Sequence, residues 1–168
     1  CATSVHGVIE ARRDPALRRI LNRALLSVPD GMPLVWMGRL QGLRLARVYG
    51  PDLMLALCAP ADEETSRPLR HFFLGATPDT LERLTRNLRA RFPGLHVVGT
   101  HAPPFRPLTT DEEDELIATL RSAQPDLIWV GLSTPKQERL MAQLTARLET
   151  GILLGVGAAF DLHAGLRR

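Results

Sequence analysis

The second half of the chain alternates short apolar runs with amphipathic segments. The apolar runs are HFFLGA (71–76), LHVVGT (95–100), LIWVGL (127–132) and GILLGVGAAFD (151–161), the last of which predicts a strand followed by a loop. Helical periodicity follows the first three, from Thr77 to about residue 91, from Asp111, and over KQERLMAQLTARL (136–148). Strands that alternate with helices predict an α/β fold, in which helices cover both faces of a mostly parallel sheet.

The first half of the chain is expected to be helical. Residues 5–11 predict a short helix, and Asp14-Pro15 provides an N-cap and a first residue for the next one. The apolar face of that second helix is expected to be Leu17, Ile20, Leu21, Ala24 and Leu25. Residues 33–40 and 51–58 predict two more helices. With 168 residues, 45% of them hydrophobic, we expect residues 1–168 to form a single globular domain.

The composition favours small anionic partners over nucleic acid. The net charge is +3, and Lys136 is the only lysine among 21 basic residues. Arginine suits nucleotide phosphates or a membrane surface. However, the arginines are dispersed and aromatic residues are only 5%, which offers few platforms for stacking bases, so we expect no nucleic-acid partner. Five histidines and two cysteines lack ligand spacing, which predicts no metal site, no cofactor and a core position for Cys58.

Small residues mark the end of each predicted strand. Ligands of parallel sheets bind beyond the carboxyl ends of the strands. The sequence there reads Gly75-Ala76-Thr77, Gly99-Thr100, Gly131-Leu132-Ser133-Thr134 and Gly155-Val156-Gly157. Glycine allows the backbone to approach a ligand closely. We therefore expect a substrate to contact Gly75, Thr77, Gly131 and Gly157.

The stretch PDLIWVGLSTPKQE (125–138) carries polar groups at a predicted helix start. Pro135 suits the first helical position, so Lys136 and Gln137 fall beside free backbone N–H groups that favour an anion. Lys136 is a candidate for binding phosphate, and the Gln137 amide can both donate to and accept from sugar hydroxyls. The alternative is ordinary capping, with Lys136 and Glu138 in solvent.

Three further groups come from the first half of the chain. LSVPDGMPLVW (26–36) places Asp30 between two apolar segments, either in a simple turn or aimed at a ligand. In RVYGPDLM (47–54), Arg47 can bind an anion bidentately or pair with Asp52. Hydroxyls of Thr3 and Ser4 follow a possible strand end near the N-terminus.

Several catalytic signatures are missing from the sequence. It has no G-x-S-x-G elbow and no GxxxxGK[ST] phosphate loop. It has no D-x-D, the paired carboxylates with which many sugar transferases hold a divalent ion. It also lacks GxGxxG, which argues against a dinucleotide oxidoreductase.

Taken in order, five stretches resemble the WecG/TagA/CpsF glycosyltransferases. They are PDGMPLVW, RVYGPDLM, FFLGATPD, PDLIWVGLSTPKQE and GVGAAFDLHAG, and the similarity covers nearly all of the chain. The resemblance implies a Rossmann-like sheet and an inverting, metal-independent transfer. The donor would be a UDP-sugar and the acceptor a polyprenyl-diphosphate-linked sugar. The work would take place at the inner face of the bacterial cytoplasmic membrane, for surface polysaccharide or teichoic acid synthesis.

The resemblance also assigns residues. Asp30 matches the aspartate proposed as the family's catalytic base, Arg47 the arginine of its R-V-x-G-x-D block and Gln137 the glutamine of its P-K-Q-E block. Thr3 and Ser4 match a Thr/Asn-rich turn. Thr134 is an added residue before the P-K-Q-E block, and it is expected to tune donor choice.

The resemblance also bears on membrane attachment and on rival functions. Relatives continue with a basic C-terminal segment where these residues end at AGLRR. We therefore expect only weak binding to anionic membranes through Arg167 and Arg168, with an apolar face over residues 34–36 as the alternative. Self-association of the chain stays open. The rival from another class is a non-catalytic nucleotide-binding domain of the same fold.

Overall fold

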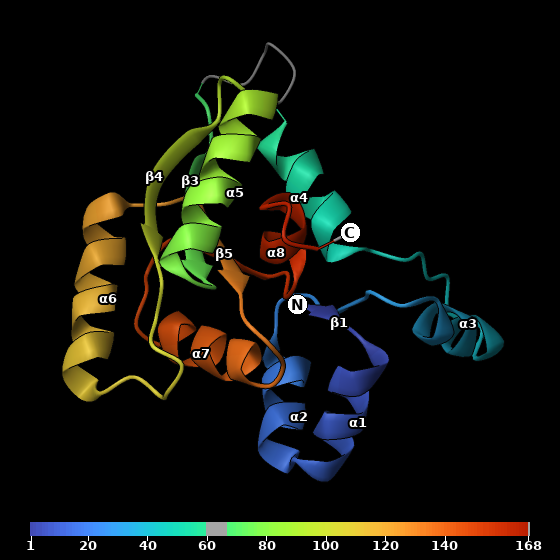
Figure 1. Cartoon of the computed structure of the whole chain (residues 1–168). Coiled ribbons are helices and arrows are strands. Elements are labelled where there is room, and N and C mark those ends of the chain that lie inside the picture. Colours follow the sequence, from blue (N-terminus) through green and yellow to red (C-terminus); the bar gives the residue numbers. More distant parts are fainter. Residues whose placement is uncertain (60–66, 168) are drawn as a thin grey trace.

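Four parallel strands form the central sheet of the protein, for which a computed structural model describes residues 1–59 and 67–167. They are β3 (Arg70–Gly75), β4 (His96–His101), β5 (Leu127–Gly131) and β6 (Ile152–Gly155). Their spatial order is β4-β3-β5-β6 (Figure 1). Helices α5 (Pro78–Arg91), α6 (Thr110–Ala123), α7 (Lys136–Thr145) and α8 (Ala159–His163) alternate with them. The predicted α/β fold is confirmed.

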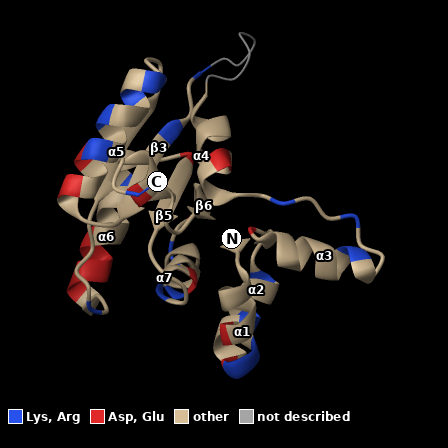
Figure 2. Ribbon diagram, turned by 45° about the vertical axis from the view of Figure 1, so that its right-hand side comes forward, with Lys and Arg blue, Asp and Glu red and all other residues tan. Residues whose placement is uncertain are grey.

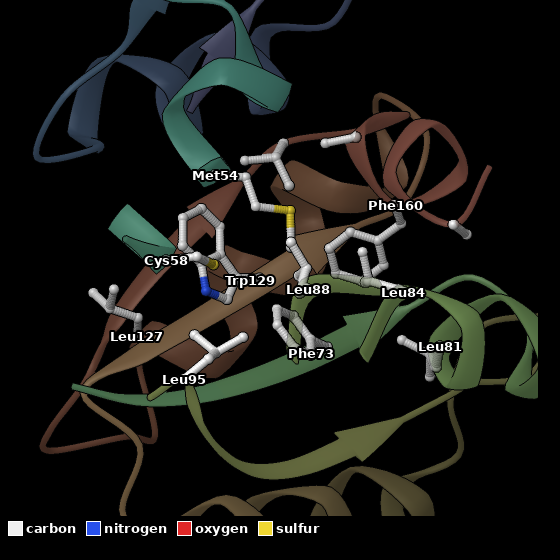
Figure 3. Close-up of a cluster of buried hydrophobic side chains, with 13 residues drawn as sticks. Met54, Cys58, Phe73, Leu81, Leu84, Leu88, Leu95, Leu127, Trp129 and Phe160 are labelled. Atoms are coloured by element: carbon white, nitrogen blue, oxygen red, sulfur yellow. The ribbon is translucent and has the colours of Figure 1, made fainter. Parts of the chain in front are cut away.

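The two central strands are buried on both faces, since successive side chains of a strand point to opposite sides. Phe73 and Trp129 face α5, α8 and α4 (Gly50–Cys58), in the apolar cluster drawn in Figure 3. Phe72 and Ile128 face α6 and α7 in a second cluster. Crossovers between parallel strands are right-handed, so the chain changes face when it changes direction along the sheet. This explains why α5 lies on one face and α6 and α7 lie on the other.

The helices begin where the sequence provides caps. Asp14 accepts hydrogen bonds from the N–H groups of Ala16 and Leu17 at the start of α2 (Pro15–Arg23). Thr77 caps α5. Thr109 opens α6 with a full capping box, in which the Glu112 side chain bonds back to the Thr109 N–H.

A smaller unit precedes the sheet. Strands β1 (Ala2–Thr3) and β2 (Val28–Pro29) pair in parallel and are separated by α1 (Val5–Arg13) and α2. The α1–α2 pair leans on α7, where Arg139 forms an ion pair with Asp14 at 2.7 Å. Helix α3 (Met32–Leu40) projects away from the remaining elements and is mostly uncharged (Figures 1 and 2).

Several local expectations are wrong. Helix α2 ends at Arg23, which leaves Leu25 94% exposed instead of on an apolar face. Gly99 lies inside β4 rather than at its end, and a Cβ there would lie 2.5 Å from the Phe72 ring. The expected final loop contains α8, and of residues 34–36 only Trp36 is exposed while Val35 is fully buried. Within the described residues, no helix is both long and apolar enough to cross a bilayer.

A buried histidine links two strands and α4. The Nδ1 atom of His71 accepts a hydrogen bond from Trp129 Nε1 at 3.0 Å, and the two rings stack. The thiol of Cys58 lies 4.0 Å from the same nitrogen, and burial raises the pKa of that thiol to about 12. Burial also lowers the pKa of His71 to about 4. Its imidazole is therefore neutral in the folded protein near pH 7.

This histidine should make the fold sensitive to acid. An unfolded chain protonates His71 below about pH 6.5. The folded chain resists protonation until about pH 4, so stability falls as the pH drops between these values, by at most about 3 kcal/mol. His71→Gln keeps an acceptor for Trp129 but does not titrate. In urea unfolding at stepped pH, its free energy of unfolding should change less over this window than that of wild type.

The control is His6→Gln, which removes an exposed histidine. It should keep the wild-type pH dependence. A wild-type slope in His71→Gln as well would show that another group causes the acid sensitivity.

Candidate active site

The parallel pairing of β1 with β2 brings two distant segments together. Thr3 lies opposite Pro29, and the Asp30 N–H donates to the Thr3 carbonyl at 3.0 Å. Ser4 and Asp30 therefore leave adjacent strand ends. The side chain of Asp30 is held by none of these bonds, since they use only its backbone.

Two oxygens at this strand end are buried without a hydrogen-bond partner. They are Oδ1 of Asp30 and Oγ1 of Thr3. Buried polar atoms are nearly always paired, and leaving one unpaired costs about 1–3 kcal/mol. Two such atoms on neighbouring residues mark a place where a ligand or a solvent molecule can supply the missing bonds.

Arg47 contacts the backbone of Asp30. Its Nε donates to the Asp30 carbonyl at 2.7 Å, and its guanidinium lies 4.3 Å above the Tyr49 ring. The Val48 N–H bonds to the Pro29 carbonyl at 2.9 Å, which fixes the segment beside β2. The alternative salt bridge with Asp52 is not among the ion pairs of the described residues. Arg47 is exposed, so its remaining N–H groups are available to an anion.

Gln137 is buried and clamps the loop after β6. Its Oε1 accepts from the Gly157 N–H at 2.9 Å. A Cβ on Gly155 would lie 2.6 Å from Gln137 Nε2, so glycine is needed for this approach. Gly157 has a φ of +54°, the left-handed conformation that suits glycine. The Gln137 acceptor is thus used within the protein. Its Nε2 donates one long bond to Glu138 Oε1 at 3.5 Å, which leaves the second N–H of the amide for a ligand.

The loop after β6 also contacts the segment that carries Arg47. A Cβ on Gly50 would lie 3.0 Å from the Val156 carbonyl oxygen, and His163 Nε2 is 3.0 Å from the Pro51 carbonyl oxygen. The start of α4 therefore rests on residues 156–163. This contact brings the Asp30–Arg47 pair to the same side of the molecule as Gln137 and Gly157.

Other predicted residues have structural partners. Lys136 is exposed, and its ammonium donates to the Phe105 carbonyl at 3.2 Å. It shares no hydrogen-bond partner with Arg47, which donates to the Asp30 carbonyl. Ser4 caps α1 and Thr77 caps α5. Gly75 and Gly131 pack together, because a Cβ on Gly75 would lie 2.5 Å from the Gly131 oxygen. These last two supply close strand packing, with their backbone at the carboxyl edge of the sheet.

Glu138 was not predicted as a site residue, and Thr134 was expected only to tune donor choice. Glu138 is 2% exposed, and its Oε1 accepts from Thr134 Oγ1 at 2.9 Å. The threonine lies beside the strand end, since a Cβ on Gly7 would lie 3.2 Å from Thr3 Cγ2 and 3.8 Å from Thr134 Cγ2. The available signal is the i,i+4 spacing of a hydroxyl and a carboxylate across a helix start.

The arrangement combines a buried carboxylate oxygen, a guanidinium, hydroxyls and an amide at one end of the fold. Such groups can accept a proton, neutralise an anion and bind sugar hydroxyls. Within residues 1–59 and 67–167, no group of three or more His, Cys, Asp and Glu side chains is arranged to hold a metal ion.

Comparison with known proteins identifies relatives of the chain. An N-acetylglucosaminyldiphosphoundecaprenol N-acetyl-beta-D-mannosaminyltransferase of Bacillus spizizenii is 26% identical over 157 residues, which are 93% of this chain and 58% of the relative. The chain thus spans less than two thirds of that protein. Residues 1–168 as a whole match a single family, and the chain belongs to the glycosyl transferase WecG/TagA/CpsF family.

Proposed function

We propose that this chain transfers an N-acetylhexosaminyl or hexosyl group from a UDP-sugar to a polyprenyl-diphosphate-linked sugar, with inversion at the anomeric carbon and without a metal ion. The main observation that supports this proposal is the buried Oδ1 of Asp30, which has no hydrogen-bond partner and lies on a residue that Arg47 contacts. Membership of the family and the activity of the Bacillus spizizenii relative support the substrate classes.

Asp30 acts as the general base in this proposal. An acceptor hydroxyl attacks the anomeric carbon, its proton moves to the Asp30 carboxylate, and the bond from that carbon to the UDP oxygen breaks. The base must lie within hydrogen-bonding reach of the hydroxyl and have a free acceptor. The free Oδ1 of Asp30 meets the second requirement, and its fixed backbone orients the carboxylate.

Arg47 neutralises the departing diphosphate. Without a metal ion, the charge that develops on UDP must be balanced by cations and N–H groups. Arg47 is anchored through Nε, which leaves the outer face of its guanidinium for bidentate binding of phosphate. Lys136 is a second candidate, provided that its ammonium exchanges the Phe105 carbonyl for phosphate.

The sugar is assigned to the part of the site formed by Gln137, the Gly157 loop and the residues of β1. Gln137 positions the Gly157 loop and offers its amide nitrogen, while the hydroxyls of Thr3 and Ser4 provide further hydrogen bonds. Gly75, Thr77 and Gly131 border the carboxyl edge of the sheet, where backbone can contact the ligand.

The lipid-linked acceptor determines the proposed location of the protein in the cell. A polyprenyl chain stays in the bilayer, so the protein would act at the inner face of the bacterial cytoplasmic membrane, in surface polysaccharide or teichoic acid synthesis. Arg167 pairs with Asp161 at 3.4 Å and Arg168 lies outside the described residues, so weak attachment through these two arginines stays a prediction.

The alternative is a nucleotide-binding domain without turnover. It would share the Arg47 side of the site but would not need a carboxylate with a free oxygen. Incubation with UDP-sugars and a lipid-diphosphate acceptor separates the two functions, since only a transferase releases UDP. Binding without release would favour the alternative.

Asp30→Asn should nearly abolish transfer while the protein stays folded. The amide fills the same space but cannot take the proton, and loss of a general base typically costs about 100- to 10,000-fold in rate. UDP release from a donor–acceptor mixture measures this. Asp52→Asn, which changes an exposed acid at the start of α4, is the matched control and should keep its rate. Near-normal turnover by folded Asp30→Asn would refute the assignment of the base.

Arg47→Ala should weaken UDP binding, because a charge-assisted hydrogen bond to phosphate is lost. Bonds of this kind contribute about 1.5–3 kcal/mol, equivalent to roughly 10- to 100-fold in affinity. Isothermal titration with UDP gives the value directly. Arg44→Ala removes an exposed arginine from the same segment and serves as the control. Unchanged UDP affinity in Arg47→Ala would contradict the phosphate role.

Transfer should survive a chelator. The sequence lacks D-x-D, and the described residues offer no cluster of metal-binding side chains. Activity after dialysis against EDTA should therefore equal activity before it. Loss of activity that magnesium or manganese restores would show that a metal takes part.

A further inference from the structure

Glu138 is a buried carboxylate with an unused oxygen. It lies in the first turn of α7 and is 2% exposed. Thr134 donates to Oε1 at 2.9 Å, while Oε2 is buried and has no hydrogen-bond partner. Among the ion pairs of residues 1–59 and 67–167, none includes Glu138, since Lys136 points to Phe105 and Arg139 binds Asp14.

The fold alone does not account for this group. Moving a carboxylate out of water is unfavourable. The positive end of α7 offsets only part of this cost. The bond from Thr134 and a long one from Gln137 Nε2 both go to Oε1, and they use only part of the four or so acceptor positions of a carboxylate. A buried oxygen left unpaired in a functional region points to a bond that forms when a ligand arrives.

The oxygen lies in the neighbourhood of the proposed site. Gln137 Nε2 is 3.5 Å from Glu138 Oε1, and Gln137 also clamps the Gly157 loop. Thr134 lies beside Thr3 at the end of β1. Five buried side-chain polar atoms of the described residues lack a partner, and those of Thr3, Asp30 and Glu138 account for three of them.

Charge decides which part of a ligand can meet Glu138. A diphosphate would be repelled by a buried carboxylate, whereas the exposed guanidinium of Arg47 offers it a cation. A neutral hydrogen-bond donor on the sugar would instead pair with Oε2. This hydrogen bond would be stronger in the buried, low-dielectric site than in water. We propose that Glu138 Oε2 accepts a hydrogen bond from a hydroxyl or amide N–H of the transferred sugar. This makes Glu138 a determinant of donor choice, an inference that rests on the proposed function.

The test separates sugar binding from nucleotide binding. UDP and two probes, UDP-N-acetylglucosamine and UDP-N-acetylmannosamine, are titrated calorimetrically without acceptor into wild type, Glu138→Gln and Glu115→Gln. Glutamine keeps the bond to Thr134 but places an N–H₂ donor where Oε2 was. Glu138→Gln should bind UDP within about twofold of wild type and should lose about 10- to 100-fold in affinity for the better UDP-sugar. Glu115→Gln changes an exposed acid on α6 and should alter neither.

A structural role for Glu138 gives a different result. If Glu138→Gln weakened UDP and the UDP-sugars equally, or left the affinities for both probes unchanged, the proposal would be overturned and the proposed function would stand. If wild type bound neither UDP nor the probes, the proposed function itself would fail. Thr134→Val tests the support of the carboxylate, since it removes the Oε1 bond while retaining the side-chain shape. It should reduce UDP-sugar affinity less than Glu138→Gln does and leave UDP affinity unchanged.

Discussion

The structure depends on the pairing of β3 with β5. Both strands are buried on two faces and bonded on two edges, so every residue in their centres must be apolar or small. At their carboxyl ends, Gly75 and Gly131 come so close that a Cβ on Gly75 would lie 2.5 Å from a backbone oxygen. Gly131 also has no room for a side chain, since its Cβ would lie 2.4 Å from the Phe160 ring. Helices α5 and α7 take their faces from the way the chain leaves these two strands.

The candidate site depends on a much smaller piece of sheet. Strands β1 and β2 contribute two residues each, and they hold Asp30 and Thr3 through backbone bonds. The Asp30 carboxylate therefore keeps an acceptor that a side-chain cap would have used. An unpaired buried oxygen is unfavourable by about 1–3 kcal/mol, a cost that the larger core offsets. Pre-orientation of this kind is typical of sites where charge develops during a reaction.

The sequence predicted the sheet well because its periodicity and its caps agree. Apolar runs marked β3 to β6, and Thr77, Asp111 and Asp14 marked helix starts, each within two residues of the observed cap. Short-range patterns could not predict α8, which has only five residues, or the position of Gly99 inside β4, which depends on the Phe72 ring from a neighbouring strand.

The site was less accessible to sequence patterns. The contact of Arg47 with Asp30 was not predicted, because it is made through a backbone carbonyl and no side-chain pattern encodes it; the sequence singled out the two residues separately. The burial of Glu138 was missed because acids in a first helical turn usually face water, and here α7 turns its start toward the small β1–β2 unit.

The order in which the chain adds strands to the parallel sheet reverses between β3 and β5. At the carboxyl ends of these two strands, Gly75 and Gly131 present only backbone. Because neither glycine has room for a Cβ, substitutions at Gly75 or Gly131 cannot change this part of the proposed site without disrupting the sheet. The side chains of the proposed site come from segments outside the central strands, near residues 3, 30, 47, 134–138 and 157. Substitutions in these segments can therefore change what the protein recognises, while the stability of the sheet stays under separate selection.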